Sequence, residues 1–445
     1  MMRIGDHGGP HRHRPETGLL TMTDRGYEDG EALGRIMGRD GFSPDLPAAL
    51  AKNGGGVSLG LRLLLYMVSG LLIGSLDITL PNGDTPRYAG DRPGPHGVWH
   101  IKSDRLIRHV LSAGEVGIGD SYMDDCWESP DLASLLLVLH LNEPYYKGPF
   151  EANWLGRAYG WWQHKRRANT RRKARKNIEH HYDLGNEFYK MWLDDTMAYS
   201  SGMFIQRSET LMQAQLNKFQ LMFERLDLGP EHHLLEIGSG WGGFAIYAAQ
   251  HSGCRVHSIT LSKEQLAEAR IRAEKAGVAD RVRFELRDYR DVREQYDRVV
   301  SIEMYEAVGE EFWPGYFATI SRALKPGGRA AIQGITINPA MFEHYRTKRD
   351  FVQKYIFPGG MLCPPGRFED LARAAGLKPA DARFYAGDYA DTLAQWHRNV
   401  LGAREAVVRQ FDERFLRMWR YYLAYCECGF RAGSIDLMQI TLHKG

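Results

Sequence analysis

The sequence predicts an α/β protein with a doubly wound, mostly parallel sheet, preceded by a smaller α+β domain. Short β-branched runs alternate with helical segments from His180 onward, which is the pattern of βαβ units. A turn with four glycines joins one of these strands to a helix. The region before it instead mixes an apolar, helix-like run with turn signals.

The chain of 445 residues has room for two or three domains, because single cores seldom grow beyond about 250 to 300 residues. We expect a disordered tail over residues 1–42, the small α+β domain over 43–150, a basic and aromatic linker over 151–178, and the α/β domain over 179–445.

The small domain should contain one helix-like run and at least one strand. The most apolar stretch, Leu63–Leu76, is shorter than the roughly 18 to 20 residues that cross a bilayer. Arg62 and Asp77 bracket it, so we interpret it as a core element rather than a membrane segment. The alternation over Ser75–Leu80 predicts a strand that enters the turn Pro81-Asn82-Gly83-Asp84.

The linker carries nine Lys or Arg residues between Arg157 and Lys176, next to Trp161 and Trp162. Such a run is often a solvated helix face. Basic residues and Trp also favour the surface of an anionic membrane. Nucleic acid would attract the same charges, but no nucleic-acid-binding motif accompanies them, and the formal charge of the chain is only +2. We therefore rank the membrane above nucleic acid.

In the larger domain, β-branched runs predict strands and the segments between them predict helices, for example Lys263–Ala276. The expected strands are His233–Ile237, Arg255–Thr260, Val282–Leu286, Asp297–Ile302 and Ala330–Ile337.

The number of cysteines and the first residues of the chain indicate the cellular compartment of the protein. Five cysteines, an odd number in a long chain, favour a reducing environment over a disulfide framework. The first residues lack the apolar core of a secretory signal. We expect a cytoplasmic protein.

The glycine turn predicts a nucleotide-like ligand. Glycines let the backbone approach a ligand closely, and the following helix presents free N–H groups. Gly238, Gly240 and Gly243 also satisfy GxGxxG, the weak signature of a dinucleotide site. A NAD site needs an acid near the end of the second strand, where this chain has Thr260 and Leu261. The acid comes before the turn instead, at Glu236, which is typical of S-adenosylmethionine methyltransferases.

Several motifs, in order, resemble the cyclopropane fatty acid synthases and mycolic acid cyclopropane synthases. The resemblance covers residue 178 onward, and the preceding hundred residues resemble the N-terminal domain of longer bacterial members. It implies a Rossmann-like S-adenosylmethionine-dependent methyltransferase fold. The matching segments are His181–Tyr189, Met197–Gly202, Leu235–Gly243, Thr260–Gln265, Asp288–Asp291, Val300–Gly309, Tyr355–Gly360 and Tyr389–Leu393.

The resemblance implies a set of cofactor contacts. The segment Leu234–Gly242 would hold the methionine end of S-adenosylmethionine, and the residues near Tyr199 would close over it. The residues after the second and third strands would hold the ribose and the adenine. The cofactor residues implied are Tyr199, Ser200, Glu236, Gly238, Gly240, Gly242, Thr260, Leu261, Gln265, Asp288 and Tyr289.

The resemblance also implies a bound bicarbonate as the base that removes a proton. Glu306, Tyr389 and the backbone at Ile335 fill three of its ligand positions. Ser201 replaces the family's Cys and Gln333 its His. Ser201 keeps the contact if its backbone amide makes it, and Gln333 can donate through its NH₂ group. An amide exchanges no proton near neutral pH, so bicarbonate binding is an open expectation.

One cysteine and two histidines are interpreted as non-catalytic. Cys426 falls where the family has a cysteine often labelled catalytic, but a thiolate would compete with the alkene for the methyl group. We expect a buried structural residue there. His180 and His181 lack the companion spacing of a metal site.

The predicted function is methyl transfer to the cis double bond of an unsaturated acyl chain in a membrane phospholipid. The resulting carbocation would lose a proton to close a cyclopropane, with methyl-branched or methylene-branched products as the alternative. We expect peripheral association with the inner face of the membrane, no nucleic-acid partner and no metal, and the sequence leaves a homodimer open. A methyltransferase acting on another small-molecule carbon and a non-catalytic lipid-binding protein are the rival classes.

Overall fold

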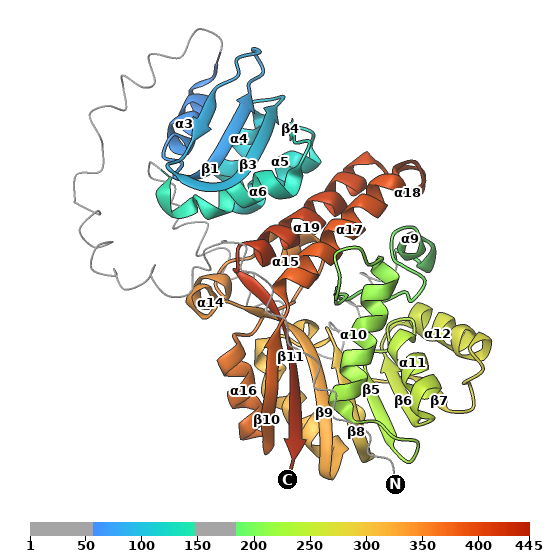
Figure 1. Ribbon diagram of the computed structural model, residues 1–445. Helices are drawn as coiled ribbons and strands as arrows, with labels where there is room; N and C mark the ends of the chain where they lie inside the picture. Colours follow the sequence, from blue (N-terminus) through green and yellow to red (C-terminus); the bar gives the residue numbers. More distant parts are fainter. Residues whose placement is uncertain (1–56, 147–183) are drawn as a thin grey trace, which may run out of the picture. The chain divides into compact units, whose positions relative to one another are not determined.

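The computed structural model describes residues 57–146 and 184–445, which belong to one compact unit (Figure 1). The predicted tail, most of the basic linker with Trp161 and Trp162, and His180 and His181 lie outside the described residues. The described residues form a four-stranded sheet and a seven-stranded sheet.

The four-stranded sheet belongs to the predicted small α+β region, and its strands pair in both directions. Its order is β2-β1-β3-β4, and β1 pairs in parallel with β3 and antiparallel with β2. The strands are β1 (Ile73–Thr79), β2 (Arg87–Ala89), β3 (Arg92–Ile101) and β4 (Trp127–Glu128). The helices are α3 (Leu59–Val68), α4 (Arg105–Ala113), α5 (Glu115–Met123) and α6 (Leu132–Leu141), followed by the 3₁₀ turn η1 (Glu143–Tyr145).

The apolar run Leu63–Leu76 divides into the end of α3 and the start of β1. Ser58 caps α3, since its side chain accepts a hydrogen bond from the Leu61 amide. Leu64 and Leu65 on α3 and Leu76 on β1 are buried, which confirms a core element. Among residues 57–146 and 184–445, no helix is both long and apolar enough to cross a membrane.

The seven-stranded sheet has the order β10-β11-β9-β8-β5-β6-β7. Six strands run the same way, and β11, between β9 and β10, is antiparallel to both neighbours. The strands are β5 (His233–Ile237), β6 (Arg255–Thr260), β7 (Val282–Leu286), β8 (Tyr296–Ile302), β9 (Leu324–Ile337), β10 (Leu377–Phe384) and β11 (Ile435–Lys444). β5, β6 and β7 have the predicted bounds, and β9 begins earlier than expected.

Successive residues of a strand point to opposite sides of the sheet, so apolar side chains on both faces must be buried. Helices cover both faces of this sheet. Leu235 on β5 packs in a cluster with residues of α13 (Trp313–Ala323) and α16 (Pro365–Ala374). Its neighbour Leu234 packs instead with α10 (Leu211–Leu226), α11 (Gly243–Ser252) and α12 (Lys263–Lys275). The doubly wound architecture is therefore as predicted.

The remaining helices lie near the carboxyl ends of the parallel strands, with α17 and α19 side by side (Figure 1). Arg417 of α19 donates hydrogen bonds to the carbonyls of Tyr122 and Trp127 and to the Glu128 carboxylate, so it ties this helix to the small sheet. These helices are α9 (Asn186–Lys190), α14 (Pro339–Tyr345), α15 (Phe351–Tyr355), α17 (Ala386–Gly402), α18 (Arg404–Gln410) and α19 (Glu413–Arg431), with 3₁₀ turns η2 (Tyr289–Asp291), η3 (Tyr305–Ala307) and η4 (Glu310–Phe312).

Candidate active site

A cavity of about 890 Å³ lies at the carboxyl ends of β5, β6, β8 and β9. Residues of α15, α17 and α19 form further walls, and residues of α3, α5 and α6 extend the cavity toward the small sheet. Ligands of doubly wound folds bind at this edge of the sheet, and the volume falls within the usual range of small-molecule sites.

The glycine turn forms one end of the cavity. Gly238, Gly240 and Gly242 have φ values of 97°, 49° and 86°, a region that residues with a side chain rarely adopt. A Cβ on Gly242 would lie 2.9 Å from Cζ of Phe284, whereas a Cβ on Gly240 would meet nothing within 4 Å. The turn therefore packs tightly on one side and leaves open room at Gly240, next to the start of α11.

A buried carboxyl and a buried amine stand beside the turn. The Glu236 carboxyl accepts a hydrogen bond from the Ser258 hydroxyl, and burial raises its pKa to about 8. Lys218 of α10 donates to Oγ of Ser200 over 2.7 Å, and burial lowers its pKa to about 8. Lys218 thus holds the Tyr199–Ser200 segment against this end of the cavity, and the Tyr199 hydroxyl also bonds that of Tyr422 on α19 at 2.8 Å.

The residues predicted to hold the ribose lie at the cavity wall. Thr260 donates to Oε1 of Gln265 over 2.9 Å, and Leu261 lies beside them. Tyr289 also lines the cavity. Asp288 is not among the lining residues, and its carboxylate pairs with Arg290 at 2.6 Å, so its contact with an adenine stays a prediction.

Glu303 is the centre of the hydrogen-bond network at the middle of the cavity. Its Oε1 accepts from the Ser201 amide at 2.9 Å and from Nε2 of Gln333 at 2.8 Å, and its Oε2 accepts from the Tyr389 hydroxyl at 2.6 Å. Gln439 of β11 donates to Oε1 of Gln333 over 2.8 Å, which turns the Gln333 NH₂ group toward Glu303. Three residues expected around bicarbonate thus surround a carboxylate of the chain itself.

Glu306 is a second carboxyl near Glu303. Its Oε1 accepts from the Ile335 amide, and its Oε2 is buried with no hydrogen-bond partner among the described residues. Burial, and then the charge of Glu303, raises its pKa to about 8. This raised pKa favours a protonated Glu306, whereas at Glu303 burial also raises the pKa but the hydrogen bonds from Tyr389, Ser201 and Gln333 oppose the increase.

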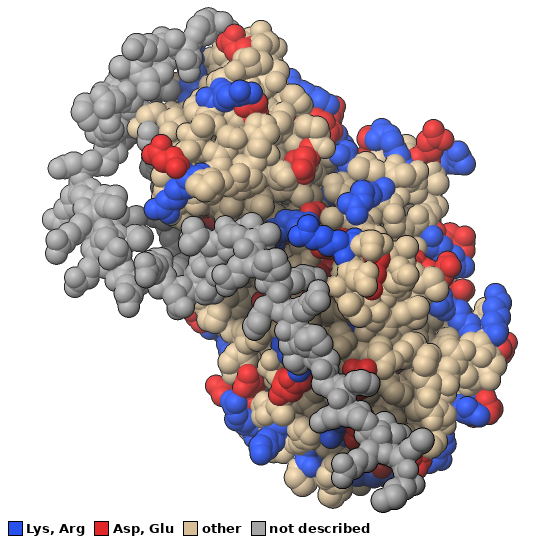
Figure 2. Space-filling view, viewed as in Figure 1, with Lys and Arg blue, Asp and Glu red and all other residues tan. Residues whose placement is uncertain are grey.

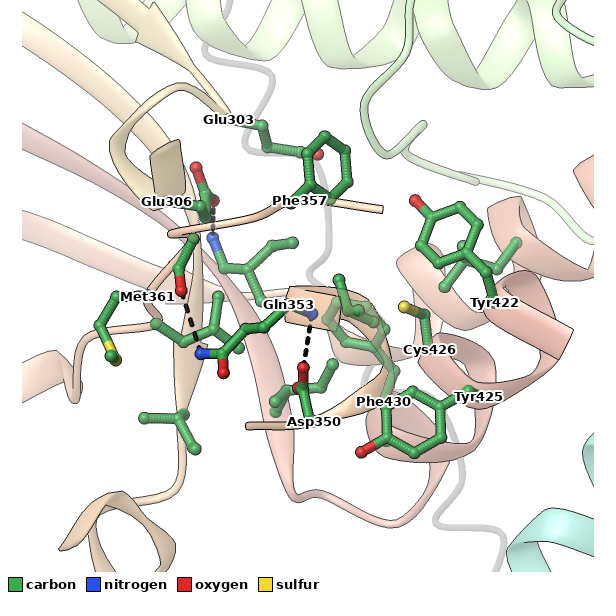
Figure 3. Close-up of a pocket in the computed structure, with 18 of the residues that line it drawn as sticks. Glu303, Glu306, Asp350, Gln353, Phe357, Met361, Tyr422, Tyr425, Cys426 and Phe430 are labelled. Atoms are coloured by element: carbon green, nitrogen blue, oxygen red, sulfur yellow. Dashed lines mark hydrogen bonds between the residues drawn. The ribbon is translucent and has the colours of Figure 1, made fainter. Parts of the chain in front are cut away.

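Aromatic rings and Cys426 form the wall on the α19 side (Figure 3). Tyr422, Tyr425 and Phe430 line the cavity from this helix, and the Phe430 ring stacks on Tyr389 with centroids 4.4 Å apart. Cys426 is half-buried and faces the cavity, which corrects the expectation of a buried residue. Burial raises the pKa of its thiol, so the group stays protonated and a poor nucleophile.

The sequence interpretation missed Glu303. It directly follows β8, at the carboxyl edge of the sheet where ligands bind, and that position was the available signal. Its φ of 49° lies in the left-handed region, which residues other than glycine adopt at a cost and often at functional sites.

Charges elsewhere on the surface are mixed. On the face that Figure 2 shows, Lys and Arg side chains alternate with Asp and Glu over the described residues. This distribution agrees with the small formal charge of the chain. Recognition of a ligand therefore depends on the local groups of the cavity.

The fold, the glycine turn with a preceding acid and the adjoining Thr260 and Gln265 define the class of S-adenosylmethionine-dependent methyltransferases. The chain belongs to the mycolic acid cyclopropane synthetase family, whose model matches residues 169–440. It is accordingly an S-adenosylmethionine-dependent lipid C-methyltransferase.

Three relatives illustrate the similarity. The tuberculostearic acid methyltransferase UfaA1 of Mycobacterium tuberculosis is 39% identical over 350 residues, which are 77% of this chain and 82% of that protein. The cyclopropane-fatty-acyl-phospholipid synthase of Escherichia coli is 33% identical over 347 residues, 78% and 87% of the two chains. The crystal structure of mycolic acid cyclopropane synthase CmaA1 complexed with SAH and CTAB superposes with a TM-score of 0.58 at 29% identity, over 61% of this chain and 98% of that one.

Proposed function

We propose that this enzyme methylates the double bond of an unsaturated acyl chain in a membrane phospholipid and leaves an unsaturated, methyl- or methylene-branched chain. The observation that carries the proposal is a single cavity that contains the glycine turn at one end, the Glu303 network in the middle and an extended apolar wall. A sulfonium donor, an alkene and a proton acceptor could meet there.

The donor end of the cavity fits S-adenosylmethionine. The open room at Gly240 accepts a ligand backbone or carboxylate, and the N-terminus of α11 offers free N–H groups to it. Glu236, Thr260 and Gln265 supply polar contacts around this room. When bound, the cofactor supplies an electrophilic methyl group on a sulfonium.

The remaining wall suits a hydrocarbon chain. Apolar side chains from the small sheet's helices and from α19 face the cavity and exclude water from it, which protects a carbocation from hydrolysis. The aromatic rings of Tyr422 and Phe430 present electron-rich faces that stabilise a positive charge. The apolar residues from the small-domain helices include Leu64, Met67, Val110, Ile118, Leu136 and Leu139.

The reaction balances without any oxidant or reductant. The alkene π pair forms the bond to the methyl carbon, the C–S pair stays on sulfur, and the other alkene carbon becomes cationic. A C–H pair next to the cation then forms a new double bond, or a hydride shift and loss of a methyl proton leave a methylene group. A saturated branch would need a reductant, so it is not proposed.

Two observations favour the branched product. The M. tuberculosis relative named for tuberculostearic acid shares 39% identity, against 33% for the E. coli cyclopropane synthase. Ser201 and Gln333 also stand where the family resemblance implies Cys and His. The cyclopropane predicted from the sequence is the second candidate, favoured by the E. coli relative, which matches over 87% of its length.

A labelling experiment tests the proposal. Purified protein would be incubated with S-adenosylmethionine carrying a CD₃ group and with vesicles of dioleoyl phosphatidylglycerol, and the fatty acids analysed by mass spectrometry before and after mild hydrogenation. A branched alkene keeps three deuterons, whereas a methylene group or a ring keeps two. The alkene and the methylene take up H₂ and the ring does not. Incorporation with resistance to hydrogenation supports the cyclopropane, and no incorporation contradicts both candidates.

A further inference from the structure

Glu303 lies where a proton acceptor is needed, and one of its carboxylate oxygens can accept a further hydrogen bond. It lines the cavity directly after β8, close to the turn that ends at the start of α11. Its backbone is held at a φ of 49°, so the surrounding structure maintains an unfavourable conformation that aims this side chain.

The hydrogen bonds of Glu303 leave one acceptor site open. Oε1 accepts from two donors, the Ser201 amide and Gln333 Nε2, which occupy both of its lone pairs. Among the residues that the structure describes, Oε2 accepts only from the Tyr389 hydroxyl, which leaves one lone pair of this oxygen available. The three donors also fix the carboxylate plane, as general-base catalysis requires.

We propose that Glu303 is the general base of the reaction and replaces a bound bicarbonate, so that this enzyme needs none. The inference rests on the proposed function. In the last step Oε2 of Glu303 forms the new O–H bond, and the C–H pair released from the substrate cation forms the double bond or closes the ring. The Ser201, Gln333 and Tyr389 donors, expected from the sequence around bicarbonate, hold the carboxylate instead.

Other groups of the cavity suit this role less well. Glu306 has a pKa raised to about 8 by burial, so it carries its proton near neutral pH. Burial and the charge of Glu303 place the pKa of Tyr389 well above its usual value, so it acts as a donor. Burial also raises the pKa of Glu303, while its hydrogen-bond donors and the Lys218 charge oppose the increase. A raised pKa in a carboxylate that is still ionised strengthens it as a base.

Two variants separate a base from a structural carboxylate. Glu303→Gln keeps the shape of the side chain but cannot accept the proton. Glu303→Gly suits the left-handed backbone and should fold, and it opens a space in which three donors remain for a small anion. Glu427→Gln is the matched control, since Glu427 of α19 is a buried carboxylate, paired with Arg431 at 2.8 Å, outside the cavity lining.

The first measurement is binding rather than turnover. The binding of SAH by calorimetry should be the same for wild type, Glu303→Gln and Glu427→Gln. The binding of ¹³C-bicarbonate in the presence of SAH, followed by NMR, should be absent in wild type and present in Glu303→Gly. Bicarbonate binding by the wild-type protein at this site would overturn the inference.

The second measurement is turnover in buffer freed of CO₂, with and without added bicarbonate. Wild type and Glu427→Gln should be equally active in both buffers. Glu303→Gln should lose about 10²- to 10⁴-fold in kcat, as expected for a missing general base, and Glu303→Gly should recover activity with bicarbonate. A Glu303→Gln variant within tenfold of wild type, or a wild type that requires bicarbonate, overturns the inference while leaving the proposed function intact. Failure of every variant to bind SAH would instead reject the proposed function.

Discussion

Gly242 occupies a position that only glycine fits without strain. Its φ is 86°, and a Cβ would lie 2.9 Å from Phe284 Cζ and 3.2 Å from the Ala269 side chain. We expect Gly242→Ala to lower the free energy of unfolding by about 1 to 3 kcal/mol through strain and overpacking. Urea unfolding followed by circular dichroism would measure the loss.

Gly366 provides the comparison for that substitution. It lies within α16, and a Cβ there would meet nothing within 4 Å. Gly366→Ala should raise the free energy of unfolding by about 0.5 to 1 kcal/mol, because alanine restricts the unfolded chain. Equal effects of the two substitutions would contradict the role assigned to the turn.

Glu306 should make stability depend on pH. Its pKa is raised by burial from an ordinary 4.5 to about 8, so between these values the folded protein holds a proton that the unfolded chain has released. The stabilisation is complete below pH 4.5 and decreases as the pH rises toward 8, by at most about 1.4 kcal/mol per pH unit. The free energy of unfolding of wild type, minus that of Glu306→Gln, should therefore decrease from pH 5 to pH 8. Parallel pH profiles of the two proteins would refute this assignment.

At the residue scale, the sequence predicted which groups donate hydrogen bonds better than it predicted which groups accept them. The Ser201 amide and the Gln333 NH₂ group were expected to donate hydrogen bonds to bicarbonate, and in the structure both donate to a carboxylate of the chain. This carboxylate is Glu303, which was not predicted, and a contact of either donor with bicarbonate stays a prediction. The pairing with Glu303 depends on how β8, β9 and α17 meet, and the strand order is not written in any local pattern of the chain.

Helix α19 connects the small sheet to the catalytic part through Arg417. This side chain is only 5% exposed, donates to two carbonyls and the Glu128 carboxylate, and lies 4.0 Å above the Tyr122 ring. Arg417→Met keeps the length but removes every donor, which leaves buried acceptors and a carboxylate unpaired. We expect a loss of about 3 to 5 kcal/mol, seen as a lower urea midpoint.

Arg414, on the same helix, is the control. Its side chain is 55% exposed and pairs with Asp124 at 3.1 Å. Exposed pairs of this kind contribute about 0 to 1 kcal/mol, so Arg414→Met should leave the midpoint nearly unchanged. A small effect of Arg417→Met would show that α19 is held to the small sheet mainly by other contacts.

At the scale of elements, local signals in the sequence were sufficient to place β5, β6 and β7. β5, β6 and β7 begin and end where β-branched runs meet turn residues, and α12 begins at its predicted residue after the Ser262 cap. The bounds and pairing of β10 and β11 were not predicted. Their antiparallel register with β9 comes from contacts between distant segments, which periodicity does not encode.

At the scale of the whole molecule, we expect the basic segment Arg157–Lys176 to bring the enzyme to the membrane that holds its lipid substrate. The segment lies outside the described residues, so its membrane role stays a prediction from the sequence. Replacing Lys165, Arg166, Arg167 and Arg171 by Gln should weaken binding to phosphatidylglycerol vesicles at least about tenfold at low salt. Binding of the wild-type chain should also weaken as salt increases. Sedimentation with vesicles would measure both effects.

A matched variant neutralises exposed basic residues elsewhere, such as Lys263 and Lys275 of α12. It should bind vesicles as wild type does. Binding that is insensitive to salt, or equally weakened by both sets of changes, would argue against a specific role for the segment.

The place of β11 in the sheet determines when this enzyme can first work. It is translated after every other strand of the seven-stranded sheet, yet it lies between β9 and β10. Gln439 on β11 also orients Gln333, which in turn holds Glu303. A nascent polypeptide still emerging from the ribosome lacks the Gln439 contact and therefore the complete hydrogen-bond network around Glu303, the proposed base. The enzyme should therefore become active only after the ribosome has synthesised all of this domain. Incomplete chains should not methylate lipid.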